Sequence, residues 1–155
     1  MKKIILILVC IFCEIALAQD AKRTFNFIIT VDENIATTLH GGEIILSKAN
    51  DIFRTIHLTY DPGNLSMNQT DYDEIIKFDG SITLKFDYHE YVKDEQKVIN
   101  YEIEMGKIWF EQSYLILNIL NTNKKKYKKV EPLQGKEYTF ELQYPTGQML
   151  RVRKK

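Results

Sequence analysis

Apolar and polar residues alternate along most of the chain from Thr24 onward, with β-branched and aromatic side chains at the apolar positions. A period of two is typical of half-buried strands, because successive side chains of a strand point to opposite faces. Four segments show it most clearly, and their predicted inward residues are Phe25, Phe27, Ile29 and Val31; Ile82, Leu84, Phe86 and Tyr88; Ile99, Tyr101, Ile103 and Met105; and Tyr138, Phe140, Leu142 and Tyr144. The pattern predicts antiparallel sheets with one face in the core and the other in water.

Turn residues stand where the alternation stops. Residues 61–64 (Asp-Pro-Gly-Asn) place proline and glycine at the centre of a type II turn. Residues 144–147 (Tyr-Pro-Thr-Gly) fit a type I turn with glycine last. The second turn predicts a hairpin between residues 137–143 and 148–153.

Two weaker turn signals predict further hairpins. One lies at residues 105–107 (Met-Gly-Lys), and the other, at residues 121–123 (Asn-Thr-Asn), is expected to join residues 114–120 with residues 127–130. The segment 114–120 is apolar on both faces, which is typical of a central strand covered on both sides.

One segment departs from the alternation. Ser66 and Gln69 have the spacing of a helix capping box. Apolar and acidic residues then recur at helical spacing, namely Met67, Asp71, Tyr72, Ile75 and Ile76. We therefore expect a short helix near residues 67–77.

These elements predict the fold class. Roughly eight or nine strands separated by turns every 8 to 12 residues are typical of a β-sandwich. We expect one all-β domain over residues 19–155, an antiparallel β-sandwich of immunoglobulin-like or transthyretin-like architecture with one short helix. A closed lipocalin-like β-barrel is the alternative.

The first 18 residues resemble a cleavable export signal. Lys2 and Lys3 precede an apolar run over residues 4–12, and Ala-Leu-Ala at residues 16–18 offers a cleavage site. We expect a periplasmic or secreted protein that begins near Gln19. The run is shorter than the roughly 20 residues of a membrane-spanning helix, so no membrane span is expected.

Both cysteines, Cys10 and Cys13, lie inside the segment that we expect to be removed. The mature chain would then have no cysteine, which excludes disulfides and thiolate chemistry. The alternative is a lipoprotein anchored at Cys10, although Val9 before it is larger than the small residue that such sites prefer.

Basic side chains are concentrated in the last third of the chain. They form two runs, which are candidates for binding an anionic envelope component or an acidic glycan: Lys124, Lys125, Lys126, Tyr127, Lys128 and Lys129, followed by Arg151 and Arg153 in the terminal segment. Nucleic acid is not expected as a partner of an exported protein. The structural alternative is a solvated hairpin tip and a charged edge strand that discourages aggregation.

Trp109 and Phe110 are candidate binding residues of a different kind. Adjacent strand residues face opposite ways, so one of the two is expected on the outer face. An exposed aromatic ring there could contact a sugar or a protein partner, whereas packing in the core is the structural alternative.

Motifs for catalysis or metal binding are not apparent. His40, His57 and His89 lack the close spacing of a metal site, and we expect three separate surface histidines. The acids Asp71, Asp73 and Glu74 fit the first turns of the predicted helix, with a weak calcium site as the alternative. We expect no cofactor.

The function predicted from these patterns is a non-enzymatic, exported binding or structural module of the cell envelope or extracellular space. A carrier of small apolar ligands with a barrel cavity is the alternative. No serine lies in a nucleophile motif, so a hydrolase would have to use a carboxylate pair such as Asp87 and Glu90. Such a hydrolase is the third reading.

Overall fold

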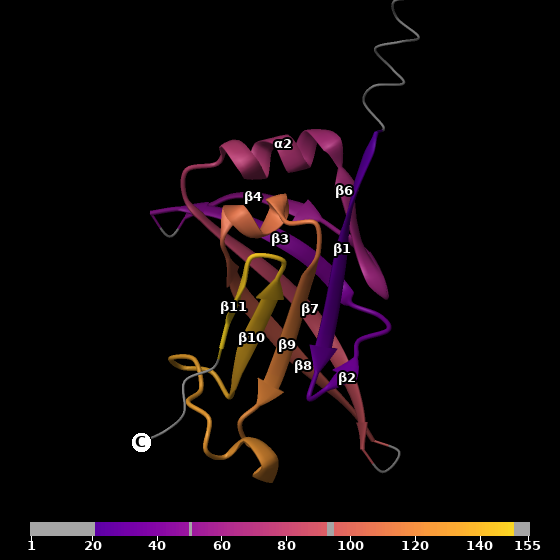
Figure 1. The fold of residues 1–155 in the computed structure, drawn as a ribbon, viewed down its shortest axis with the longest axis vertical. Helices are drawn as coiled ribbons and strands as arrows, with labels where there is room; N and C mark the ends of the chain where they lie inside the picture. Colours follow the sequence, from indigo (N-terminus) through magenta and orange to yellow (C-terminus); the bar gives the residue numbers. More distant parts are fainter. Residues whose placement is uncertain (1–20, 50, 93–94, 151–155) are drawn as a thin grey trace, which may run out of the picture.

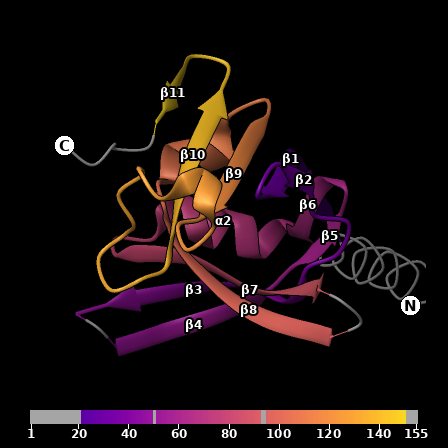
Figure 2. The ribbon, with the colours of Figure 1, turned by 90° about the horizontal axis from the view of Figure 1, so that it is seen from below.

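The chain folds into two β-sheets packed face to face, with a short helix across one end (Figures 1 and 2). The computed structural model describes residues 21–49, 51–92 and 95–150. The predicted export signal and the basic terminal segment with Arg151 and Arg153 lie outside the described residues. No described helix is both long and apolar enough to cross a bilayer.

The larger sheet follows the order β11-β10-β9-β1-β6-β5, and β2 pairs with β1. Its strands are β1 (Lys22–Val31), β2 (Asn34–Ile35), β5 (Thr59–Asp61), β6 (Gly63–Asn68), β9 (Leu115–Asn121), β10 (Tyr138–Tyr144) and β11 (Gly147–Met149). The smaller sheet, in the order β4-β3-β7-β8, contains β3 (His40–Lys48), β4 (Asp51–His57), β7 (Ser81–Val92) and β8 (Glu95–Met105). The β-sandwich prediction is therefore confirmed. Because the sheets do not close on each other, the barrel alternative is wrong.

The apolar side chains that the alternation predicts to point inward fill the core between the sheets. Along β8, for example, Tyr101, Ile103 and Met105 are buried, and the inward residues of β1, β7 and β10 behave likewise. Where strand ends approach the rim, Phe25, Tyr88, Ile99 and Tyr144 are only partly buried. Apolar burial of this extent is the main stabilising contribution to such a fold.

The structure contains tight turns at both positions where proline and glycine predict one, residues 61–64 and residues 144–147. Gly63 has a φ of 91°, which the third position of a type II turn requires, and Asp61 pairs with Asn64. Tyr144 pairs with Gly147, which closes the β10–β11 hairpin. The predicted continuation of β11 to residue 153 extends beyond the described residues.

The two hairpins predicted from weaker turns are wrong. After Gly106 the chain forms the 3-10 helix η1 (Lys107–Glu111) and crosses to the other sheet, where β9 pairs with β1 in parallel. After Asn121 a long loop with the 3-10 helix η2 (Lys125–Tyr127) intervenes, and β9 pairs with β10 instead. The prediction failed because a turn residue marks where a strand ends, not which strand lies beside it in space.

Strand β9 occupies the centre of the larger sheet, as predicted, but its two faces differ. Leu115, Leu117 and Ile119 are buried between the sheets, whereas Ile116 on the other face is only partly buried. The loop after β9 covers that outer face only at Leu120. The prediction of cover on both faces therefore holds only at this end.

The helix α2 (Gln69–Lys77) confirms the predicted helix but not its cap. Asn68 is the N-cap and makes no side-chain capping bond, while the Ser66 hydroxyl is hydrogen-bonded to the Thr24 hydroxyl at 2.9 Å. The main-chain N–H of Gln69 donates to the carbonyl of Ala21 at 2.8 Å, so the residue just before β1 holds the start of the helix.

Candidate functional site

A groove lies at an open edge of the sandwich, where β8 faces β10 and β11. It encloses about 530 Å³, within the range of about 300–1,000 Å³ typical of ligand sites. Its walls combine apolar, aromatic and charged groups from five segments, namely Glu102, Glu104, Met105, Gly106, Trp109, Leu133, Gln134, Lys136, Phe140 and Met149. We call this site the β8 groove.

The β8 groove lies along a strand edge that no described strand covers, because β8 is the last strand of its sheet. At Glu102 the edge is occupied by a side chain: the Tyr138 hydroxyl accepts from the Glu102 N–H and donates to the Glu102 carbonyl, each at 2.8 Å. Main-chain groups two residues apart point the same way, so the N–H and carbonyl of Glu104 are also directed toward this edge. The groove therefore contains main-chain hydrogen-bonding groups as well as side chains.

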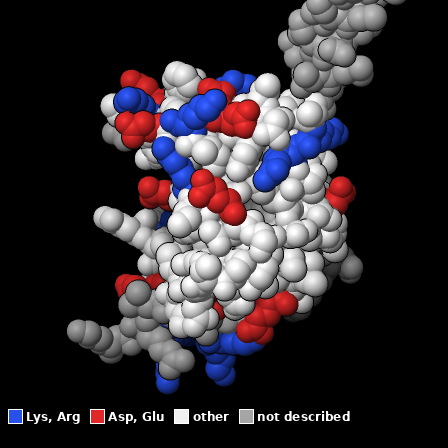
Figure 3. Space-filling model, turned by 45° about the horizontal axis from the view of Figure 1, so that its top comes forward, with Lys and Arg blue, Asp and Glu red and all other residues white. Residues whose placement is uncertain are grey.

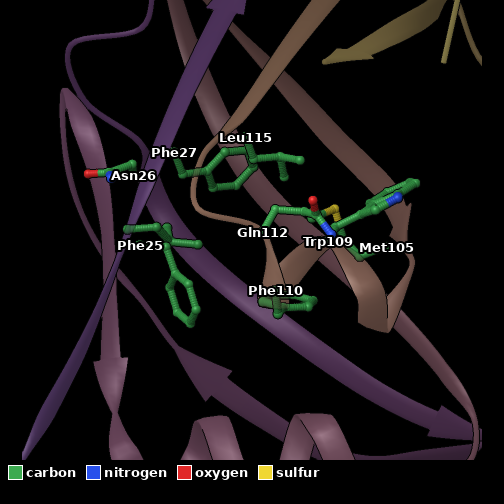
Figure 4. Close-up of a pocket in the computed structure, with 9 residues that line it drawn as sticks. Phe25, Asn26, Phe27, Met105, Trp109, Phe110, Gln112 and Leu115 are labelled. Atoms are coloured by element: carbon green, nitrogen blue, oxygen red, sulfur yellow. The ribbon is translucent and has the colours of Figure 1, made fainter. Parts of the chain in front are cut away.

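Trp109 and Phe110 leave η1 in different directions, as Figure 4 shows. Phe110 is buried in the core, whereas Trp109 is half-buried and lines the β8 groove. The indole ring packs on Gly106, where an added Cβ would lie 3.4 Å from Cε2 and 3.5 Å from Nε1 of the ring. The expectation that one of the pair faces outward agrees with this arrangement, although both lie on a 3-10 helix rather than a strand.

The apolar slot behind Trp109 does not offer a second ligand site. It lies between Phe25, Phe27 and Phe110 (Figure 4) and has a free volume of only about 10 Å³. A single water needs about 10–15 Å³. This slot is therefore packed core.

An ion pair forms one wall of the β8 groove. Lys136 Nζ donates to Glu102 Oε2 at 2.5 Å, and Lys85 Nζ lies 3.8 Å from the other carboxylate oxygen. The hydrogen bond from Lys136 holds the pKa of Glu102 below its usual value, and the same bond raises the pKa of Lys136. The neighbouring carboxylate of Glu104 is exposed and has no hydrogen-bond or ion-pair partner in the part of the chain that the structure describes.

The basic run at residues 124–129 lies at the opposite end of β9 from Trp109 (Figure 1). Lys124 binds Asp32 at 2.7 Å and Glu90 at 2.6 Å, and Lys126 binds Glu33. Tyr127 is buried against Leu120 and Val130. The exposed members without an ion pair among the described residues are Lys125, Lys128 and Lys129.

Three carboxylates, those of Asp32, Glu33 and Glu90, thus bind lysines of the loop that carries this run. Burial alone would lower the pKa of Lys124, but its hydrogen bonds to Asp32 and Glu90 raise that pKa above the usual value. Asp32 also accepts a hydrogen bond from the main-chain N–H of Asn121 at 2.8 Å. About half of the run is therefore committed to holding the loop. Figure 3 likewise shows charges of both signs side by side on the face that it displays.

The histidines are not all separate. His40 and His89 stack with ring centroids 3.9 Å apart and an interplanar angle of 10°, because β3 and β7 are neighbours. Gln96 Nε2 lies 2.6 Å from His89 Nδ1. The expectation of three independent histidines is wrong for this pair. It failed because residues distant in sequence become cross-strand neighbours.

The acids of α2 are engaged by an arginine from β4. Arg54 binds Asp71 at 2.5 Å and also binds Glu74, whereas Asp73 accepts a hydrogen bond from Gln69 at 2.8 Å. Over residues 21–49, 51–92 and 95–150, no group of three or more His, Cys, Asp or Glu side chains is arranged to hold a metal ion. This geometry favours the reading in which the acids belong to the first turns of α2 over the calcium-site alternative.

The carboxylates considered for a hydrolase have separate partners. Asp87 accepts a hydrogen bond from Asn100, and Glu90 binds Lys124. A catalytic pair needs one carboxyl group free to protonate a leaving group. Their contacts therefore give no support to this pairing.

Of the residues that line the β8 groove, only Trp109 was predicted from the sequence as a candidate site residue. Glu104, Phe140 and Met149 were missed because three separate strands bring them together. A partial signal was present: Glu102 and Glu104 are acidic outward positions in an alternating strand, and such positions mark an exposed face.

Comparison with protein-family models, with curated proteins and with solved structures finds no match to this chain.

Proposed function

We propose that this protein is an exported, non-enzymatic binding module, and that its β8 groove takes a short extended polypeptide segment carrying a basic side chain. The observation that carries the proposal is the uncovered edge of β8 inside a groove with an aromatic wall. Strand addition to such an edge draws affinity from main-chain hydrogen bonds and specificity from side-chain pockets.

The length of the free edge limits the segment to a few residues. Tyr138 occupies the edge at Glu102, and the carbonyl of Gly106 accepts from the N–H of Trp109 at 3.0 Å. Glu104 lies between these two points. About three residues of ligand span this distance at roughly 3.4 Å per residue.

The charge of the preferred segment follows from Glu104 and Trp109. The Glu104 carboxylate attracts a cation, and the indole face of Trp109 favours a guanidinium or ammonium group placed over it. Leu133, Phe140 and Met149 supply apolar contacts for alternate side chains of the same segment.

The proposal is tested with an acetylated and amidated peptide of alternating valine and arginine, titrated against residues 19–155. Glu104→Pro removes both the main-chain N–H that points into the groove and the carboxylate that attracts the basic side chain, and proline is tolerated at the outer side of an edge strand. Val98→Pro is the matched control, because Val98 has the same orientation on β8 but lies outside the β8 groove.

We expect Glu104→Pro to weaken peptide binding by at least about tenfold, as loss of a central contact does, and Val98→Pro to change it less than about twofold. A peptide with glutamate in place of arginine should bind at least about tenfold more weakly, by charge repulsion. Equal weakening by both proline variants contradicts the proposal. So does binding of neutral oligosaccharides in place of the peptide, which would make the Trp109 wall a glycan site.

A further inference from the structure

The end of β11 already lies in the β8 groove. Leu142 pairs with Met149, and Met149 is one of the residues that line the groove. Beyond the exposed Leu150 the sequence continues with residues 151–155, which read Arg-Val-Arg-Lys-Lys. A basic segment therefore starts next to the site for which we propose a basic ligand.

The register of the β10–β11 hairpin predicts where the next residues would go. Continuing the pairs Tyr144–Gly147 and Leu142–Met149 by one step places residue 151 opposite Phe140. Directly opposite residues of an antiparallel pair share a face, so the side chain of Arg151 would enter the β8 groove beside Phe140.

The main chain of β10 favours this continuation. The carbonyl of Tyr138 accepts from the N–H of Leu133 at 2.9 Å, on the side of β10 that faces away from β9. Phe140 lies two residues further along β10, so its N–H and carbonyl point to that same side. They are in position to pair with residue 151.

The chemistry of the groove suits an arginine. Glu102 is neutralised by Lys136, but Glu104 has no ion-pair partner among the described residues. A guanidinium placed there has a carboxylate and the indole of Trp109 as neighbours. Because the segment is tethered at Met149, its effective concentration in the groove is high.

We propose that residues 151–155 of the chain dock in its own β8 groove, with Arg151 directed to Glu104 and Trp109, and compete there with an incoming segment. The competition rests on the function proposed above, whereas the docking does not. The docked segment would pair with β10 and leave the edge of β8 at Glu104 uncovered, so a ligand displaces it by competing for the groove volume and for Glu104.

The experiment compares Arg151→Glu with Lys154→Glu in residues 19–155. Both variants make the same change in net charge, but in the proposed continuation of the strand residue 154 would fall on the opposite face. Trp109 is the only tryptophan, so acrylamide quenching of its fluorescence reports directly on cover of the groove. Peptide affinity is measured in the same samples with the valine–arginine peptide.

We expect Arg151→Glu to raise the quenching constant of Trp109 at least twofold and peptide affinity at least fivefold, with Lys154→Glu close to wild type in both. Adding Glu104→Arg to Arg151→Glu should restore the low quenching constant. Equal quenching in wild type and Arg151→Glu overturns the docking. Changed quenching with no peptide binding in any variant upholds the docking and contradicts the proposed function instead.

Discussion

The hydroxyl of Tyr138 connects the two sheets at the β8 groove, and its removal has a predictable effect. Tyr138→Phe deletes one oxygen and with it both hydrogen bonds to the main chain of Glu102. The ring remains, together with its edge-on contact to Tyr101 at a centroid distance of 4.8 Å. The substitution therefore isolates the hydrogen bonds from the apolar packing.

The expected loss follows from the two bonds. Each intramolecular hydrogen bond contributes about 0.5–1.5 kcal/mol net, so we expect the free energy of unfolding to fall by about 1–3 kcal/mol. The freed groups of Glu102 border the β8 groove, where water can reach them, which favours the lower half of this range. At a urea m-value of roughly 2 kcal/mol/M, the unfolding midpoint would fall by about 0.5–1.5 M.

Urea unfolding followed by Trp109 fluorescence measures this loss. Tyr144→Phe is the matched control, because Tyr144 lies on the same strand and its hydroxyl has no hydrogen-bond partner among the described residues. We expect the control to change stability by less than about 0.5 kcal/mol. Equal losses in the two variants would refute the assigned role of Tyr138 at the β8 edge.

Three further substitutions test other parts of the structure. The pKa of Glu102 is lowered in the fold, so its ionised form stabilises above the usual pKa of about 4.3, and this contribution is lost as pH falls through the lowered value. The stability advantage of wild type over Glu102→Gln, measured by thermal unfolding, should therefore shrink below about pH 4.3. A stability difference that stays constant with pH would contradict this role of Glu102. Ala49 has a φ of 52°, in the left-handed region that strains a residue with a Cβ. Ala49→Gly should therefore stabilise the protein by about 1 kcal/mol, seen as a rise in Tm, and a fall in Tm would show that this strain is absent. Asp32→Ala removes a largely buried acceptor of two hydrogen bonds and should cost about 2–4 kcal/mol in urea unfolding, whereas Asp32→Asn, which keeps one acceptor, should cost less than half of that.

Sequence alone predicted the elements whose alternation is strong. The inward residues of β1, β7, β8 and β10 were identified correctly because burial of one sheet face imposes a period of two. The same reasoning could not reveal that β8 is an edge strand. Edge position depends on which strands pair in space, and nothing in residues 95–105 records it.

The candidate site was predictable only in part for the same reason. Trp109 was selected because adjacent strand residues face opposite ways, which placed either Trp109 or Phe110 on the outer face. Its neighbours Phe140 and Met149 come from another hairpin. The basic run at residues 124–129 was conspicuous as well, yet Asp32 and Glu33 from the β1–β2 turn bind two of its lysines. Charge in a sequence does not reveal which opposite charges the fold places beside it.

The main-chain amide of Glu104 tests the central claim most directly. Hydrogen exchange of residues 19–155, followed by NMR, compares this amide with those of Ile103 and Met105, which point toward β7. We expect Glu104 to exchange rapidly in the free protein and to become at least about tenfold slower when the valine–arginine peptide is bound. If the peptide binds while exchange at Glu104 stays unchanged, the ligand does not add to the edge of β8 and the account is wrong.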